Sequence, residues 1–391
     1  MGDSLAPRAE NRLHLHRSAG VPGALRCPAE WISGLISSIG LTVAPGRGNV
    51  GRVKISRRTL IAVATAGAAA ASGTPARAGG RGVVRPPALR PGDRVRVVAP
   101  AGVPDSRLAR GIQILESFGL VVEQGAHLYD RYGYLAGTDA DRLADLNAAF
   151  RDPGVRGVFA ARGGYGTQRI IDGLDLAAVH RDPRVFVGFS DLTVLSGRLW
   201  TSDRLVSFYG PMVNWTDART GPAEIESLRR AVMTTDPIVL TSDPAEPSAA
   251  VSVPGVATGT LLGGNLTMLH ASLGTPDLPD LRGAILMFED TDESPYSYDR
   301  MLTSLIRAGA LRRIAGVAVG QFTNAPVTSG QWTAAQAVQD RLGGLGVPVL
   351  GGLRIGHGNG QLTVPLGARA TIDTAAGTLS VAAGVRAGSP Y

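Results

Sequence analysis

The sequence is almost devoid of cysteine. Cys27 is the single cysteine among 391 residues, so residues 79–391 contain none. This absence excludes a disulfide framework, a thiol nucleophile and a cysteine-ligated metal from that part of the chain.

Residues 79–391 also lack any net charge. The chain as a whole carries a formal charge of +7, but residues 1–78 hold ten basic and three acidic residues and account for all of it. Nucleic-acid binding by the rest of the chain therefore loses its main support, and we expect no nucleic-acid partner. The hydrophobic content of 44% is typical of a globular protein, and the length allows two domains with their own cores.

No apolar run near the N-terminus is long enough to span a membrane, which needs about 20 residues. In residues 54–78, Arg57 and Arg58 precede an alanine-rich apolar run that ends in Ala76-Arg77-Ala78. This pattern resembles a twin-arginine export signal, and it predicts an exported protein without a stable membrane span after signal cleavage. The alternative is an amphipathic or membrane-anchoring helix. We expect residues 1–53 to be a non-native or disordered extension.

The remaining sequence predicts an α/β fold in two domains. In residues 79–235, short β-rich runs alternate with helical patterns, which is typical of a parallel sheet covered by helices. Residues 236–250 are rich in Pro, Ser and Asp and are interpreted as a linker. Residues 251–391 form the second unit, whose last part alternates as antiparallel strands do. In such parallel sheets the site lies at the carboxyl ends of the strands.

One polar position interrupts the stretch "RVFVGFSDLTVL", which reads as a buried strand followed by a helix. Ser190 stands at its turn. The serine could cap the helix, which is the commoner use of serine there. It could also be a nucleophile held on a sharp turn, although the glycine expected two residues later is Leu192.

A glycine-rich turn, Gly163 to Gly166, follows another predicted strand. Such a turn suits a phosphate loop, an oxyanion hole or a plain tight turn. The sequence has neither the Gly-x-Gly-x-x-Gly spacing nor the Lys-Ser/Thr pair of a P-loop here, so nucleotide binding has little support.

A serine nucleophile needs a base and an acid that orients the base. Residues 79–391 contain four histidines, and His357 lies between glycines in "RIGHGNG". Glu289 ends the apolar strand "AILMFED", where a carboxylate needs a partner. Asp290 is the alternative candidate for the acid, and strand alternation would point the two side chains in opposite directions. A surface loop for His357 and a salt bridge for Glu289 are the structural alternatives.

These segments together resemble the LD-carboxypeptidase family of serine peptidases, which includes the microcin C immunity peptidases. The resemblance spans about residues 86–370 in the family's order. It is carried by "PPALRPGDRVRVVAPAG", "YLAGTDADRLADLNAAF", "AARGGYGTQRIIDGLD", "VGFSDLTVL", "FYGPM", "GTLLGGNLTML", "LMFEDTDESPYSYDRML" and "IGHGNGQLTVPLG".

The resemblance implies a flavodoxin-like N-terminal domain with a parallel sheet and a smaller β-rich C-terminal domain of the swivelling β/β/α type. It implies that Ser190 is the nucleophile, His357 the base and Glu289 its acid. No metal and no cofactor are expected, and a homodimer is common in the family.

Substrate contacts follow from the same resemblance. Gly163 and Gly164 would line the site, and the backbone N–H of Asp191 would be an oxyanion donor. Arg162 is the candidate for holding the terminal carboxylate. Trp215 could stack on a ligand or simply pack.

The expected function is an exported serine L,D-carboxypeptidase that removes the terminal D-alanine from the tetrapeptide stems of peptidoglycan through an acyl-enzyme. Its partner would be a muropeptide or a peptidoglycan stem peptide. The alternatives are a microcin-immunity peptidase that cleaves aminoacyl-nucleotide amides and a catalytically silent wall-binding homologue.

Overall fold

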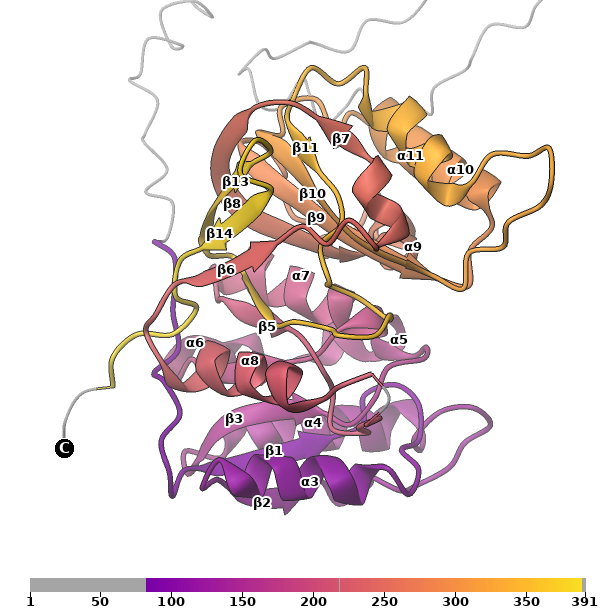
Figure 1. Ribbon diagram of the computed structural model, residues 1–391. Coiled ribbons are helices and arrows are strands. Elements are labelled where there is room, and N and C mark those ends of the chain that lie inside the picture. The colour runs from indigo at the N-terminus through magenta and orange to yellow at the C-terminus, as the bar shows by residue number, and fades with distance from the viewer. Residues whose placement is uncertain (1–81, 218, 389–391) are drawn as a thin grey trace, which may run out of the picture. The chain divides into compact units, whose positions relative to one another are not determined.

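A six-stranded sheet forms the first half of the fold, and its strand order is β12-β5-β4-β3-β1-β2 (Figure 1). The computed structural model describes residues 82–217 and 219–388, so the expectations for residues 1–53, for the signal at 54–78 and for Cys27 lie outside the described residues. The strands are β1 (Arg94–Val98), β2 (Val121–Gln124), β3 (Val155–Ala160), β4 (Val185–Val187), β5 (Ser207–Tyr209) and β12 (Val364–Leu366). Strands β1 to β5 are parallel, and β12 runs antiparallel to β5.

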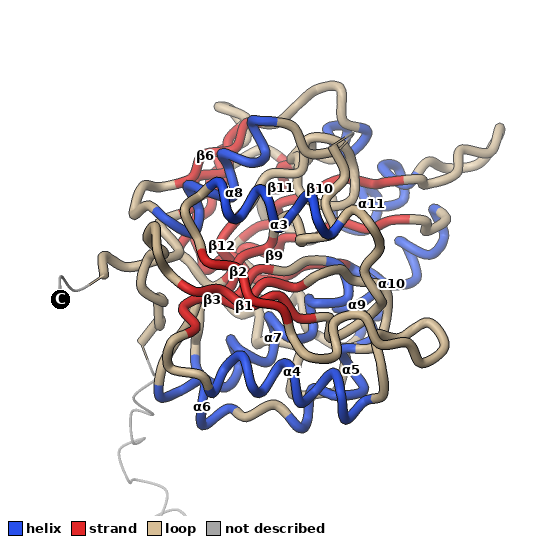
Figure 2. The backbone as a smooth tube through the Cα atoms, turned by 90° about the horizontal axis from the view of Figure 1, so that it is seen from below, coloured by secondary structure: helices blue, strands red, loops and turns tan. Residues whose placement is uncertain are grey.

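Helices cover both faces of this sheet (Figure 2). They are α3 (Leu108–Ser117), α4 (Asp139–Arg151), α5 (Thr167–Ile170), α6 (Leu176–Arg181), α7 (Thr193–Asp203) and α8 (Pro222–Met233). The short 3-10 helices η2 (Ile171–Gly173) and η3 (Ser190–Leu192) precede α6 and α7. Alternation along β3 separates two cores: Phe159 packs with α3 and α8, whereas Val158 packs with α4, α6 and α7.

The order β2-β1-β3-β4-β5 is that of a flavodoxin-like sheet, which confirms the predicted α/β class. The strand order reverses between β1 and β3, and ligands of such sheets bind beyond the carboxyl ends of the strands at this point. The loops after these two strands meet there, because the Gly102 N–H donates to the Gly163 carbonyl over 3.2 Å.

The second sheet has eight strands in the order β6-β14-β13-β8-β9-β10-β11-β7. Its strands are β6 (Ile238–Thr241), β7 (Ser252–Val253), β8 (Val256–Asn265), β9 (Ala284–Thr291), β10 (Gly316–Thr323), β11 (Val349–Leu350), β13 (Arg369–Asp373) and β14 (Thr378–Val381). Strands β8 to β11 are parallel, and β13 and β14 are antiparallel as predicted.

The two faces of β9 serve different purposes. Phe288 packs under the helices α9 (Leu266–Ala271), α10 (Pro295–Arg307) and α11 (Ala334–Leu342). On the other face, Met287 packs in a core that contains Phe189 and Tyr209 of the first half. The second sheet therefore lies against the carboxyl ends of β4 and β5.

Residues 236–250, interpreted as a linker, are built into the second sheet. They contain β6, which pairs with β14, and the 3-10 helix η4 (Pro247–Ala250) with the buried Ser248. Conversely, β12 crosses back to the first sheet. Among the described residues, no helix is both long and apolar enough to cross a membrane.

Candidate active site

Ser190 occupies a strained turn between β4 and α7. Its φ angle is +62°, a region that residues other than glycine rarely adopt. Its side chain makes no capping hydrogen bond to the helix that follows, which excludes the alternative of a helix cap. Strained backbone of this kind is found at nucleophile turns, where it exposes the hydroxyl.

Gly188 explains how the turn can do without the second glycine. A Cβ atom at position 188 would lie 2.9 Å from the Cβ of Leu192. Glycine on one side of Ser190 therefore leaves the room that the leucine on the other side needs.

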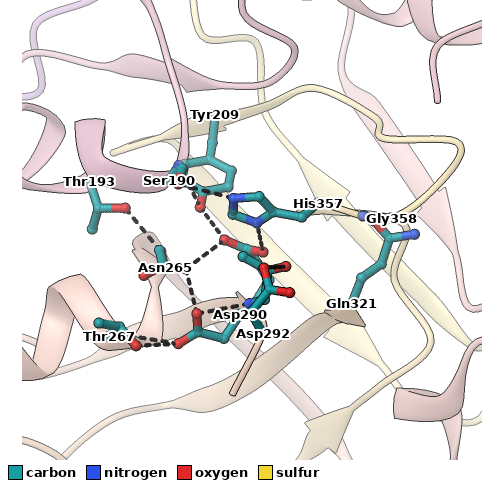
Figure 3. A network of polar contacts seen from close by, with 12 residues as sticks. Ser190, Thr193, Tyr209, Asn265, Thr267, Asp290, Asp292, Gln321, His357 and Gly358 are labelled. Atoms are coloured by element: carbon teal, nitrogen blue, oxygen red, sulfur yellow. Dashed lines mark hydrogen bonds and ion pairs between the residues drawn. The ribbon is translucent and has the colours of Figure 1, made fainter. Parts of the chain in front are cut away.

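Ser190, His357 and Glu289 form one chain of hydrogen bonds. Figure 3 shows the His357 ring directed at Ser190. The Ser190 Oγ lies 3.0 Å from His357 Nε2, and His357 Nδ1 lies 2.7 Å from Glu289 Oε2. Ser190 comes from the turn after β4, Glu289 from β9, and His357 from the loop after β11. The structure thus brings together three residues that were predicted from separate segments.

The environment of the triad favours the protonated form of His357. Burial by itself lowers the pKa of His357, but the charge of Glu289 and its hydrogen bond outweigh burial, so the pKa is raised above 6.5. The Glu289 side chain is fully buried and the His357 side chain is 11% exposed. An imidazolium formed during a reaction would therefore be stabilised at short range by the Glu289 carboxylate.

Tyr209 and Asn265 hold the second oxygen of Glu289. The Tyr209 hydroxyl donates to Glu289 Oε1 over 2.7 Å, and Asn265 Nδ2 donates to the same oxygen over 3.3 Å. The Tyr209 hydroxyl also accepts the backbone N–H of Ser190 at 3.2 Å. Sequence reasoning missed both residues, although each is a polar residue at the end of a strand within "FYGPM" or "GTLLGGNLTML".

Asp290 points away from the triad, as strand alternation predicted (Figure 3). Its carboxylate accepts hydrogen bonds from Asn265 Nδ2 and from the backbone N–H and the hydroxyl of Thr267. Burial and the nearby charge of Glu289 raise the pKa of Asp290 to about 6. Because Asn265 bonds both carboxylates, Asp290 helps to orient the amide that supports Glu289.

The glycine turn packs directly on the serine. A Cβ atom on Gly163 would lie 3.1 Å from the Ser190 Cβ and 3.3 Å from its Oγ. Gly164 has φ +117° and lines the same pocket as Gly163. The Asp191 carboxylate accepts the backbone N–H and the hydroxyl of Thr167, at 2.9 and 2.6 Å. It thereby ties the end of the glycine turn to the nucleophile turn.

A pocket of about 410 Å³ opens on Ser190 and His357. Arg162, Gly163 and Gly164 line it, as expected. Trp215 lies at its edge but is 4% exposed, and its indole N–H donates to the Thr220 carbonyl over 3.1 Å. Trp215 therefore packs and shapes the loop that bounds the pocket.

One group of described residues has the spacing of a metal site: His127, Asp130 and Asp141, whose ligand atoms lie within 4.8 Å of one another. His127 already pairs with Asp130, and Asp141 belongs to the capping box of α4 with Thr138. None of the three lines the pocket.

Two family models cover most of the described chain. Residues 95–210 match the LD-carboxypeptidase N-terminal domain, and residues 258–372 match the LD-carboxypeptidase C-terminal domain.

Relatives of established sequence similarity agree with this assignment. The chain is 43% identical to a putative carboxypeptidase of Streptomyces coelicolor, over 77% of this chain and 97% of the relative. It is 39% identical to a probable murein peptide carboxypeptidase of Bacillus subtilis, over 78% and 96%. The solved muramoyltetrapeptide carboxypeptidase of Oxalobacter formigenes superimposes with a TM-score of 0.66 at 31% identity, over 74% and 98%. The chain therefore belongs to the LD-carboxypeptidase family.

Proposed function

We propose that the protein is an exported serine L,D-carboxypeptidase that releases the terminal D-alanine from peptidoglycan tetrapeptide stems. The unbroken hydrogen-bonded series Ser190, His357 and Glu289, of which the serine and the histidine line the pocket, carries this proposal. The substrate class is supported by the relatives named murein peptide and muramoyltetrapeptide carboxypeptidase.

The first half of the reaction acylates the serine. Glu289 accepts a hydrogen bond from the Nδ1–H of His357, which fixes the tautomer whose unprotonated Nε2 takes the proton of Ser190. The serine oxygen attacks the carbonyl carbon of the L-configured third residue, and the carbonyl oxygen becomes an oxyanion. When the oxyanion collapses, the C–N bond breaks, and His357 gives its proton to the amine of the departing D-alanine.

The second half restores the enzyme. Water takes the place of D-alanine, His357 accepts one of its protons, and the remaining hydroxide attacks the acyl ester. The ester bond to Ser190 breaks, and His357 returns the proton to the serine oxygen. The atoms balance to one water consumed for each D-alanine released.

The oxyanion needs backbone donors near Ser190. The N–H of Ser190 itself is bonded to Tyr209, so the donors we assign are the N–H groups of Gly163, Gly164 and Asp191. Each such donor contributes typically about 3 to 4 kcal/mol to transition-state stabilisation. The Asp191 carboxylate accepts hydrogen bonds from Thr167 through Oδ2, and an ionised carboxylate has no proton to donate, so the backbone N–H is the group of Asp191 that can serve in this role.

The proposal that the protein is exported is supported by the pattern of Arg57, Arg58 and the apolar run before Ala78. Purified protein should release D-alanine from a disaccharide tetrapeptide, and absence of that release would refute the proposed activity. N-terminal sequencing of secreted protein tests export separately. A mature chain that begins well before Gly79 would contradict signal cleavage after Ala78.

A further inference from the structure

We propose that Arg219 and Gln361 bind the C-terminal carboxylate of the substrate, on the side of the pocket where the leaving residue sits. The inference rests on the proposed function, since it concerns the recognition of the residue that leaves. It assigns the requirement for a free chain end to two side chains that line the same pocket as His357.

Three arginines line the pocket, and they differ in their partners. Arg107 forms an ion pair with Asp105, with Nη2 2.5 Å from Oδ2, and its Nη1 donates a hydrogen bond to the Thr216 hydroxyl. The Arg162 guanidinium donates to the Val103 carbonyl over 3.3 Å. Within the part of the chain that the structure describes, neither Arg162 nor Arg219 has an ion pair with an acid.

The order of the chemical steps selects between the two remaining arginines. His357 must hand its proton to the leaving amine, so the leaving residue has to lie against His357. Arg219 is joined to the loop that carries this histidine, because the Gly360 N–H donates to the Arg219 carbonyl over 2.8 Å. Arg162 instead lies over Gly102, where a Cβ would come within 3.3 Å of its Nε.

The positive charge of Arg219 acts on the His357 imidazole. Burial lowers the pKa of His357, Glu289 and Asp290 raise it, and Arg219 lowers it. A substrate carboxylate paired with Arg219 would offset that last contribution. Binding of a free chain end would thereby make His357 a stronger base in the complex.

Gln361 supplies independent evidence for a ligand at this position. It lines the pocket and is 3% exposed, yet its Nε2 has no hydrogen-bond partner among the described residues. A buried donor without an acceptor is rare in folded proteins. Since Gln361 follows Gly360, which is bonded to the Arg219 backbone, one carboxylate could accept from both side chains.

The test compares two substrates on the same preparation: the tetrapeptide L-Ala-γ-D-Glu-diaminopimelate-D-Ala and its C-terminal D-alaninamide. We expect wild type to prefer the acid, and Arg219→Gln to reduce this ratio of kcat/KM values about 100-fold. Gln361→Met should reduce it about 10-fold. Arg219→Lys, which keeps the charge, should retain more of the preference than Arg219→Gln. The control Arg229→Gln neutralises an arginine on α8 that pairs with Glu226 and does not line the pocket, so the ratio should stay unchanged.

The ratio does not depend on the folded fraction, because both substrates meet the same active molecules. An unchanged ratio in Arg219→Gln would overturn the inference, as would a loss of preference in Arg162→Gln while Arg219→Gln keeps it. If wild-type protein releases neither D-alanine nor D-alaninamide, the proposed function itself fails, and the two failures are therefore distinguishable.

Discussion

The Tyr209 hydroxyl donates a 2.7 Å hydrogen bond to Glu289 Oε1 and thereby joins the two sheets at the triad. Tyr209 ends β5 of the first sheet, and Glu289 lies near the end of β9 of the second. The same hydroxyl accepts the Ser190 N–H, so one buried group positions both the acid and the backbone of the nucleophile. Burial, together with Glu289, raises the pKa of Tyr209 well above 10, which keeps the hydroxyl protonated.

Removing this hydroxyl should damage the reaction more than substrate binding. In Tyr209→Phe, the Ser190 N–H and Glu289 Oε1 each lose a partner, and we expect kcat to fall about 10- to 100-fold with little change in KM. The free energy of unfolding should fall by about 1 to 3 kcal/mol. Steady-state kinetics and urea unfolding measure both effects.

Tyr298→Phe is the matched control. Tyr298 is fully buried, and its hydroxyl has no hydrogen-bond partner among the described residues. Loss of that hydroxyl should leave kcat unchanged. Equal kinetic losses in the two variants would show that the two hydrogen bonds of the Tyr209 hydroxyl have no specific role in the reaction.

Ser190→Ala should reduce D-alanine release by about 10⁴-fold or more, because no other group can form the acyl-enzyme. The fold should persist, since His357 is the one hydrogen-bond partner of this hydroxyl among the described residues. Ser196→Ala removes the hydroxyl of a buried serine on α7 that has no hydrogen-bond partner within the described part of the chain, and this variant should retain activity. Substantial turnover by Ser190→Ala would refute the acyl-enzyme mechanism.

The pH dependence of the reaction should follow His357. Only neutral imidazole can accept the serine proton, and the pKa of His357 is raised, so kcat/KM should decline on the acid side with a midpoint above pH 6.5. Glu289→Gln removes the carboxylate that raises this pKa. The midpoint should then move to lower pH, while kcat/KM falls about 10³- to 10⁴-fold.

Profiles recorded from pH 5 to 9 would measure this displacement. Glu226→Gln neutralises a surface carboxylate of α8 that pairs with Arg229, and its midpoint should match that of the wild type. A midpoint that does not move in Glu289→Gln would show that another group sets the acid limb.

Gly163→Ala should crowd the nucleophile without unfolding the protein. The added Cβ would lie 3.1 Å from the Ser190 Cβ, so the serine must shift by a few tenths of an ångström. We expect kcat/KM to fall about 10- to 100-fold, because small displacements of reacting groups are costly. The melting temperature should change little.

Gly344→Ala provides the comparison for Gly163→Ala. A Cβ at position 344 meets no atom within 4 Å, so activity should be retained there. Full activity of Gly163→Ala would contradict the close packing of the glycine turn on the serine.

Much of the arrangement could be predicted from local patterns. Alternating apolar strands and helices predicted the α/β class, and polar positions at or after predicted strands made Ser190, Glu289 and His357 candidates, to which the family resemblance gave their roles. These features depend on side-chain periodicity and turn chemistry, which are properties of short segments.

The crossing of chain segments between the two halves could not be predicted in this way. Strand β12 lies in the first sheet, and β6 lies in the second although its segment resembles a linker. Pairing of this kind is decided by which edges remain open after the nearer strands have packed. The composition of a segment therefore does not predict which strand it will pair with.

The sequence by itself determined the candidate residues, because Ser190, Glu289 and His357 follow or end predicted strands and match, in order, the nucleophile, acid and base of the family that the chain resembles. Only the tertiary structure decided the contacts themselves: Glu289, which the resemblance implies as the acid, lies against His357, and Tyr209 and Asn265 donate to its other oxygen. The reason is physical: these contacts join residues up to 167 positions apart, and sheet register and packing set their distances to within a hydrogen bond.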